Sequence, residues 1–409
     1  MKKLFLIMGL GILLSLQLYA GNSIFSYEGY PVRFFCKDIY SLGMGDVGST
    51  DSFRPNNGFA NPALHNRTAS TLFSTGMVMG YTRYSSDFDT LGVKHFTDNS
   101  LDLPYFSLSV PYKKHRFGFQ FNSYASGLVK NQLAFKDSNN VTVTEYQSMD
   151  RYMYRADLIY NILLGKLSLG VSGNFLLGHE NRSFKQESGS GIFNTAESVT
   201  KSYKNPTATF GIIDTGDWYS VGMHYTLGAN LKGEQQRTSI HETELATDYE
   251  MEVPSQFAAG LTLLPRKYFK LAMDLSYEDW SGISDNYVQS YKIGIGAAYE
   301  PQKEQYYSKL GKVPYRGGLS WRKLPFKDSS GNEINELSLS LGLTLPLKRD
   351  VNRVDFGFQY TRRGDLTTNK LRDDAFMLMV GFTGFDIITK AADRKAPREI
   401  PVAEDIKAW

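Results

Sequence analysis

Residues 337–345 read Leu-Ser-Leu-Ser-Leu-Gly-Leu-Thr-Leu, so apolar side chains alternate with small, uncharged polar ones throughout. Successive side chains of a β-strand point to opposite faces, which predicts one face of leucines and one face of Ser, Gly and Thr. A half-buried strand of a water-soluble protein usually shows charged side chains to bulk water. This pairing of faces is instead typical of the wall of a membrane β-barrel, with leucines toward lipid and small polar residues toward the lumen.

The same two-faced alternation recurs along most of the chain and predicts about fourteen strands. Their approximate spans are 70–84, 102–112, 115–125, 141–162, 166–182, 206–214, 217–232, 254–264, 268–280, 287–299, 313–323, 336–347, 352–362 and 374–385. Most of them reach the roughly 9–11 residues that a tilted strand needs to cross a bilayer. The predicted fold class is therefore all-β: a transmembrane antiparallel β-barrel of about fourteen strands with an N-terminal plug, or hatch.

The connections between the predicted strands also alternate in length. Short ones are 112–114, 165–166, 215–216, 265–267 and 348–351, and long polar ones are 85–101, 126–140, 183–205, 233–253 and 324–335. An outer-membrane barrel requires short periplasmic turns and long external loops, and only 300–312 is long where a short turn is expected. A soluble β-sandwich or a lipid-binding barrel is the alternative, but it explains neither the strand lengths nor this asymmetry. We therefore expect the outer membrane of a Gram-negative-type bacterium, with membrane lipid around the wall.

The two ends of the chain differ from its alternating part. Lys2 and Lys3, followed by an apolar run that ends near Ala20, predict a signal peptide. The predicted organisation is a signal peptide at 1–20, a periplasmic or luminal plug at 21–69, the barrel at 70–385 and a periplasmic tail at 386–409. The tail is either a flexible end or a docking segment for a periplasmic partner. A net charge of +3 gives no electrostatic case for nucleic acid.

The segment before the first predicted strand carries a family resemblance. Residues 41–64 are rich in Gly and end in an Asn-Pro-Ala element. The matching residues are Gly43, Gly45, Gly48, Asn61, Pro62 and Ala63, and the segments 253–261 and 277–281 add further likeness. This pattern resembles the N-terminal hatch of the FadL-type outer-membrane transporters of long-chain fatty acids and other hydrophobic compounds. The likeness covers most of residues 40–385.

The resemblance implies a transporter that captures a hydrophobic small molecule in its external loops. It also implies lateral release through the barrel wall at a kink in the third strand, where Gly118, Asn122 and Ser123 would permit a bulge. The long external loops are polar here, and Ile192 and Phe193 form the only adjacent apolar pair in the 183–205 loop. Because the family's capture loops expose more apolar surface, a ligand other than a fatty acid stays open.

The alternation of side chains between the two faces of each predicted strand, which we call strand parity, predicts which charged side chains face the lumen. They are Arg155, Asp157, His224, Lys270, Asp274, Lys292, Arg316, Arg322 and Asp355. Arg155, Arg316 and Lys292 are the candidates for binding a ligand carboxylate, since guanidinium groups match carboxylates in bidentate geometry. The alternative is that charges of both signs pair with each other across the lumen.

The remaining motifs argue against catalysis and metal binding. The six histidines are scattered, with no close pair at metal-ligand spacing, and no phosphate-binding loop or nucleophile elbow stands out. We therefore expect no metal, no cofactor and no enzyme activity. A second function stays open, namely a non-transport accessory barrel of the same superfamily, such as a type 9 secretion component or a structural outer-membrane protein.

Overall fold

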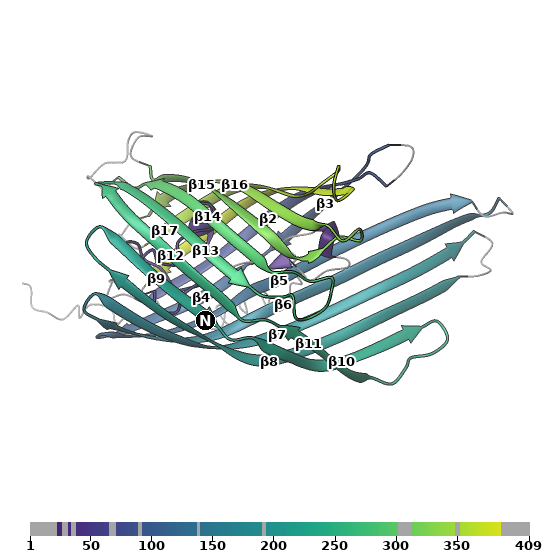
Figure 1. Ribbon diagram of the computed structural model, residues 1–409, viewed down its shortest axis with the longest axis horizontal. Coiled ribbons are helices and arrows are strands. Elements are labelled where there is room, and N and C mark those ends of the chain that lie inside the picture. Colours follow the sequence, from purple (N-terminus) through teal and green to yellow (C-terminus); the bar gives the residue numbers. More distant parts are fainter. Residues whose placement is uncertain are drawn as a thin grey trace, which may run out of the picture.

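The computed structural model describes residues 23–26, 32–33, 38–64, 71–88, 92–136, 140–189, 194–301, 313–347 and 352–385. They form one continuous antiparallel sheet (Figure 1), with the 3₁₀ turn η1 (Ile24–Ser26) and the helix α2 (Ile39–Leu42) before the wall strands. No helix among the described residues is long and apolar enough to cross a membrane. The predicted signal peptide, the predicted tail and most of the 300–312 connection lie outside the described residues.

The wall is built from strands in sequence order. They are β2 (Leu72–Ser86), β3 (Lys94–Asp102), β4 (Tyr105–Tyr112), β5 (His115–Lys136), β6 (Thr142–Leu164), β7 (Leu167–Ser188), β8 (Thr195–Thr215), β9 (Tyr219–Thr226), β10 (Ala229–Ser239), β11 (Thr247–Val253), β12 (Gln256–Arg266), β13 (Phe269–Glu278), β14 (Ser290–Tyr299), β15 (Tyr315–Lys327), β16 (Glu333–Pro346), β17 (Arg353–Asp365) and β18 (Leu371–Phe385). Three wall strands each consist of two pieces, β3 with β4, β9 with β10, and β11 with β12. Pairing of β18 with β2 closes the barrel. The predicted all-β barrel of 14 strands is confirmed.

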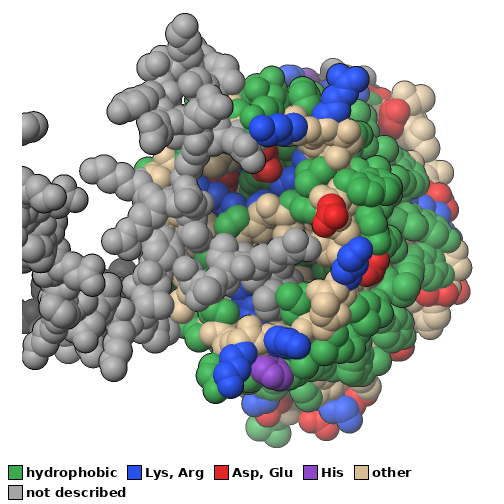
Figure 2. All heavy atoms as spheres, turned by 90° about the vertical axis from the view of Figure 1, so that its left-hand side faces the viewer, with side chains coloured by type: hydrophobic (Ala, Val, Ile, Leu, Met, Phe, Trp, Pro, Cys, Tyr) green, Lys and Arg blue, Asp and Glu red, His purple; other side chains and the backbone are tan. Residues whose placement is uncertain are grey.

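The predicted division between lipid face and lumen face is also observed. In β16 the leucines point outward, and Leu341 is 55% exposed, whereas its neighbour Ser340 is fully buried on the lumen side. The same parity holds around the barrel, so hydrophobic side chains cover the outer wall while charged side chains gather at the mouth (Figure 2). A closed sheet leaves no unpaired edge in the lipid, which is why strands can cross a bilayer at all.

Several strands run much farther than predicted. The predicted loops 126–140, 183–205 and 233–253 are largely strand, because β5 continues to Lys136, β7 to Ser188, and β10 and β11 fill most of the last loop. The prediction was wrong because both faces of these extensions meet water, so the apolar alternation that identified the strands stops. The second wall strand likewise begins at Lys94, inside the predicted 85–101 loop.

These extensions carry one side of the barrel beyond the membrane. On β7 the outward side chains are mostly apolar from Leu167 to Leu177 and polar from His179 onward. The 22 residues of β7 span roughly 70 Å at ~3.3 Å per residue, or about 55 Å along the barrel at a ~40° tilt. An apolar band is only ~25 Å tall. We call the outer parts of β5–β8 with β10 and β11 the projecting sheet, and the opposite end of the barrel the short-turn end (Figure 1).

Residues 38–64, which we call the luminal segment, lie inside the barrel against the wall. A Cβ added at Gly296 or Gly318 would come within 2.0 or 2.4 Å of the backbone oxygen of Met44, so only glycine fits there. In the segment itself Gly45 has a φ of +83°, and a Cβ there would lie 2.7 Å from a wall carbonyl. Small residues on the lumen face of the strands are thus explained by the close approach of this segment.

The outward position of Leu341 makes a direct prediction. Leu341→Arg places a charge near the middle of the lipid face, which costs about 2–4 kcal/mol. We expect a marked loss of folded, heat-modifiable barrel when the variant is refolded into lipid vesicles and run unboiled on a gel. Ser330→Arg, in an exposed turn, is the control and should refold like the wild type. Equal yields for the two variants would contradict the assignment of the lipid face.

Candidate functional site: the packed lumen

The luminal segment is held in one conformation by Arg54. This side chain donates to Asp38 at 2.6 Å and to Asp51 at 2.9 Å, and its guanidinium lies 4.1 Å from the centre of the Tyr40 ring. Asp38 also caps α2, because its carboxylate accepts the N–H of Ser41 at 3.0 Å. Burial alone would raise the pKa of Asp38, but the Arg54 charge outweighs it and holds that pKa well below its usual range.

Buried ion pairs also tie the luminal segment to the wall. Lys270 of β13 lies 2.9 Å from Asp51 and 2.9 Å from Glu300, which follows β14. Lys292 of β14 pairs with Asp46 of the segment. A buried charge that loses its partner is strongly destabilising, so the pairs of Lys270 with Asp51 and of Lys292 with Asp46 resist displacement of the segment.

The three predicted ligand-binding cations are all engaged within the protein. Arg316 donates to the backbone oxygen of Tyr40 at 2.9 Å and lies 3.5 Å from Asp355. Arg155 pairs with Asp157 of its own strand at 2.9 Å, and Lys292 makes the pair described above. Charges of both signs therefore meet in the lumen, and ligand binding by these residues stays a prediction.

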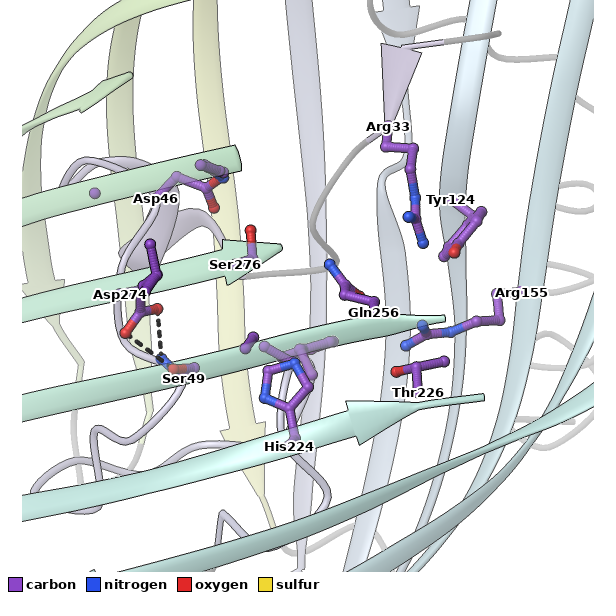
Figure 3. A pocket seen from close by; sticks show the side chains of 16 residues that line it. Arg33, Asp46, Ser49, Tyr124, Arg155, His224, Thr226, Gln256, Asp274 and Ser276 are labelled. Atoms are coloured by element: carbon purple, nitrogen blue, oxygen red, sulfur yellow. Dashed lines mark hydrogen bonds and ion pairs between the residues drawn. The ribbon is translucent and has the colours of Figure 1, made fainter. Parts of the chain in front are cut away.

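The structure brings Arg155 and Lys292, but not Arg316, to one cavity (Figure 3). Its walls include Arg33, Asp46, Ser49, Tyr124, Arg155, His224, Thr226, Gln256, Asp274 and Lys292. In this lining Ser49 donates to Asp274 at 2.9 Å, which again joins the luminal segment to the wall. The cavity measures about 40 Å³, and a neighbour that shares three of its residues measures about 50 Å³. Ligand pockets usually span roughly 300–1,000 Å³, so these two are too small for a hydrocarbon chain.

Toward the projecting sheet an apolar cluster fills the barrel. It contains Phe25, Tyr124, Met153, Leu176, Tyr203, Leu231, Val253, Trp280, Leu324, Phe326 and Ile334. Trp280 is fully buried, and its indole N–H donates to Glu278 at 2.8 Å. Trp280 therefore faces inward and packs on Tyr287, away from the lipid face. Among the described residues, the luminal segment and this cluster therefore occupy two levels of the lumen.

The Asn-Pro-Ala element anchors the far end of the luminal segment. Asn61 accepts the N–H of Ala63 at 3.0 Å and donates to the backbone oxygen of Met223 at 3.3 Å. Asn161 of β6 donates to the oxygen of Pro62 at 2.9 Å. The element thus ends the segment in a turn that is fastened to β6 and β9.

The residues suggested for a kink in the third strand fall on β5. Gly118 lies in regular pairing with both neighbouring strands. A register shift occurs between Ser123 and Ala125, directly after Asn122, and the N–H of Ser123 donates to Pro104 at 2.9 Å. Use of this bulge as a gate stays a prediction. Residues Ile192 and Phe193, suggested for ligand capture, lie outside the described residues.

Sequence reasoning missed the acidic residues that lock the segment. Asp38, Asp46 and Asp51 carry no motif, and none was singled out. The available signal was that the predicted lumen contained an excess of cations, which must meet carboxylates from somewhere else in the chain. No group of three or more His, Cys, Asp and Glu side chains able to share a metal ion lies among the described residues.

The buried pair between Lys270 and Asp51 can be tested against an exposed one. Lys270→Met removes the cation that Glu300 shares with Asp51, although Asp51 keeps Arg54, and should lower the free energy of unfolding by about 3–5 kcal/mol. Lys232→Met removes an exposed partner of Glu250 and should cost no more than about 1 kcal/mol. Urea unfolding of the detergent-solubilised barrel, followed by tryptophan fluorescence, measures both. Equal effects would mean that the lumen is wet and the pair is screened.

Acid should weaken the same lock. Burial raises the pKa of Glu300, but Lys270 and the Tyr40 hydroxyl outweigh it and bring the pKa down to about 2. A lowered folded-state pKa gives stability above the unfolded value of ~4.3, and that stability is lost as the pH falls toward 2. Glu300→Gln should therefore lower the free energy of unfolding by about 2 kcal/mol. This difference from the wild type should be the same at pH 8 and at pH 5, and it should shrink below about pH 4. A difference that already shrinks between pH 7 and pH 5 would contradict this.

Comparison with solved structures supports the fold. The toluene transporter TodX of Pseudomonas putida matches with a TM-score of 0.60 at 15% identity, covering 88% of this chain and 99% of that one. A FadL homologue of Pseudomonas aeruginosa matches with a TM-score of 0.58 at 11% identity, covering 86% and 98%. The toluene transporter TbuX of Ralstonia pickettii matches with a TM-score of 0.56 at 14% identity, covering 88% and 100%. The search of curated proteins found no match.

These likenesses place the chain among barrels of the FadL-like fold, and a closed wall of this kind fits the outer membrane of a Gram-negative bacterium. At such low identities they establish the fold alone. The family model that matches is a different one, BamG, and it extends over residues 1–386. The chain belongs to the BamG family.

Proposed function

We propose that this protein is a non-transporting accessory barrel of the outer membrane, which binds a protein partner through its projecting sheet. The observation that carries the proposal is the packed lumen. In the part of the chain that the structure describes, the luminal segment occupies one level and the apolar cluster the next, and the two cavities described above measure about 40 and 50 Å³.

The cost of opening this lumen supports the proposal. To move the luminal segment aside, the pairs of Lys270 with Asp51 and of Lys292 with Asp46 must both break. Removing one partner from a buried pair costs about 3–5 kcal/mol, and whole domains are stable by only about 5–15 kcal/mol. The free energy needed to open such a passage would therefore approach the free energy of unfolding the barrel.

The projecting sheet supports a role in binding. Four strands, β5 to β8, have 21 to 23 residues each, far more than the roughly 9–11 that a bilayer crossing needs. Several large apolar side chains on it or beside it are exposed: Phe88, Phe96, Leu133 and Phe135. Exposed apolar groups beyond the lipid band are typical of surfaces that meet another protein.

Reconstitution of the purified barrel tests the absence of transport. In planar bilayers and in vesicles loaded with a hydrophobic probe, we expect no conductance and no uptake above protein-free controls. A variant that lacks residues 38–64 should conduct, which shows that the assay detects an opened lumen. Conductance or uptake by the wild-type protein would overturn the proposal.

A second candidate function rests on the groove beside β3 and β5. This groove measures about 680 Å³ and has Phe88, Phe96 and Leu133 in its wall. Solved structures of the same fold are titled as toluene transporters and as a FadL homologue. On this view the groove captures a long-chain fatty acid or other hydrophobic compound, which leaves laterally near the bulge at Ser123. Such a route would avoid the packed lumen.

Mass spectrometry of ligands extracted from the purified barrel tests this second function. An amphipathic ligand that is present in the wild type and lost in Leu133→Lys would favour it. Leu341→Ala, on the lipid face far from the groove, is the control and should retain the ligand. Absence of any such ligand, together with unchanged uptake in a deletion strain, would contradict it.

A further inference from the structure

The barrel wall is split at its outer end between β3 and β5. The strand made of β4 and β3 bends at Leu103 and Pro104, and β5 carries its register shift at the same level. Below this level β4 pairs with β5, whereas above it β3 pairs only with β2 among the described strands. We call the opening between β3 and the outer part of β5 the seam.

The register shows which backbone groups of β5 face the seam. Leu163 donates its N–H to Lys114 at the foot of the β5–β6 pair, so the odd-numbered residues of β6 point their hydrogen-bonding groups toward β5. Beyond the register shift these residues pair with odd-numbered residues of β5. The β5 residues left pointing into the seam are Leu128, Lys130, Gln132, Ala134 and Lys136.

The same reasoning applies to β3. Asp87 donates its N–H to Lys370, so the odd-numbered residues of β2 face β18 and the even-numbered ones face β3. Even-numbered β2 residues pair with even-numbered β3 residues. The β3 residues pointing into the seam are therefore His95, Thr97, Asn99 and Leu101. Asn99 directs its N–H to the Asp98 carboxylate at 2.8 Å. Among the described residues no other strand pairs with these two edges, which face each other across the seam.

The inner end of the seam already holds a strand. The two-residue strand β1 (Val32–Arg33) pairs antiparallel with Ser126 and Ala125 of β5. Its Arg33 is fixed by an ion pair with Glu278. The edge of β5 therefore accepts an added strand, and this position is continuous with Leu128 and the residues beyond it.

The seam lies outside the apolar band. Ser126 pairs with Tyr152 of β6, and Tyr152 in turn pairs with His179 of β7. His179 is the first polar outward residue of β7 after Leu177. From Lys130 onward the residues of β5 are exposed, so this part of the edge meets water or lipid head groups. Lipid tails lie within the apolar band and do not extend to this part of the wall, whereas an extended peptide from another protein can reach it.

The groove of about 680 Å³ borders the seam through β3 and β5 and extends across to β2, β15, β16 and β18. Its apolar wall residues include Phe88, Phe96, Val129 and Leu133. Its charged wall residues are Lys94, Lys130, Lys327 and Asp328. Three cations against one carboxylate favour an occupant that carries negative charge, and the apolar wall residues favour an occupant that also carries apolar side chains.

We propose that the seam binds an extended segment of a partner protein by β-strand addition. The segment pairs its backbone with the open edges of β3 and β5 and places apolar and acidic side chains in the groove. Backbone hydrogen bonds supply much of the affinity in this mode, and the side-chain pockets supply the specificity. The inference rests on the proposed partner-binding function and names its site and its geometry.

Residue-resolved hydrogen exchange of the full-length barrel, with and without its crosslinked partner, tests the geometry. For crosslinking in cells, a photoreactive benzoylphenylalanine replaces Ala134, and Ser148 on the outward face of β6 serves as the control position. Strand addition predicts that exchange slows at Lys130 and Gln132 and stays unchanged at Asn131, which β6 already binds. Uniform slowing, or slowing in β6 alone, would overturn strand addition.

A matched pair of proline variants supplies the second readout. Gln132→Pro removes an N–H that faces the seam and should fold normally, because proline is tolerated on an open edge, while partner recovery falls about tenfold. Leu245→Pro, in an exposed loop away from the seam, should leave recovery unchanged.

The outcomes separate the inference from the proposed function. Undiminished partner recovery with Gln132→Pro, or a lipid rather than a protein adduct at position 134, would overturn the seam as the binding site. A protein adduct that forms equally at position 148 would be consistent with the accessory function but would place the partner-binding surface outside the seam. Absence of any protein adduct at both positions would count against the accessory function as well.

Discussion

The salt bridges between the luminal segment and the barrel wall are the interaction on which the rest of this structure depends. Lys270 and Lys292 extend into the lumen from neighbouring strands, and each meets a carboxylate of the segment. An unpaired charge in this packed interior would be costly, so the segment and the wall require each other. Small polar residues and glycines on the inner face, such as Gly296 and Gly318, follow from the same arrangement.

This arrangement separates fold from function. The wall has the topology of outer-membrane transporters, and solved structures of that fold cover nearly the whole chain. Function, however, depends on the site and not on the fold. Here, among the described residues, buried ion pairs and an apolar cluster pack the inside of the barrel, while the projecting sheet and the seam are exposed. The proposal of an accessory barrel follows from that contrast.

Much of the wall could be predicted from the sequence, because lipid on one side and a small-residue lumen on the other impose a period of two. The run at 337–345 predicted both faces of β16 correctly. The outer ends of β5, β7 and β8 could not be predicted, because both faces of those segments meet water and the periodicity disappears. The inward position of Trp280 could not be predicted either, since an aromatic at a strand end fits a lipid interface and an inward apolar cluster equally well.

The site was less predictable than the fold. Parity placed Arg155, Lys292 and Arg316 on the lumen side, but their partners come from a segment without periodicity, and contacts between distant parts of a chain leave no local pattern. The register shift beside Asn122 could be suspected from composition. The open edges of the seam could not, because they depend on where β3 parts from β5.

The central claim is that the luminal segment stays in place, and thiol labelling tests it most directly. In a background in which Cys36 is replaced by serine, Val47→Cys puts a single thiol in the buried middle of the segment, and Ser330→Cys puts one in an exposed turn. With a small maleimide applied to native membranes, the account predicts rapid labelling at position 330 and none at position 47 until the barrel is unfolded. Labelling at position 47 in the folded barrel, on the timescale of position 330, would contradict it.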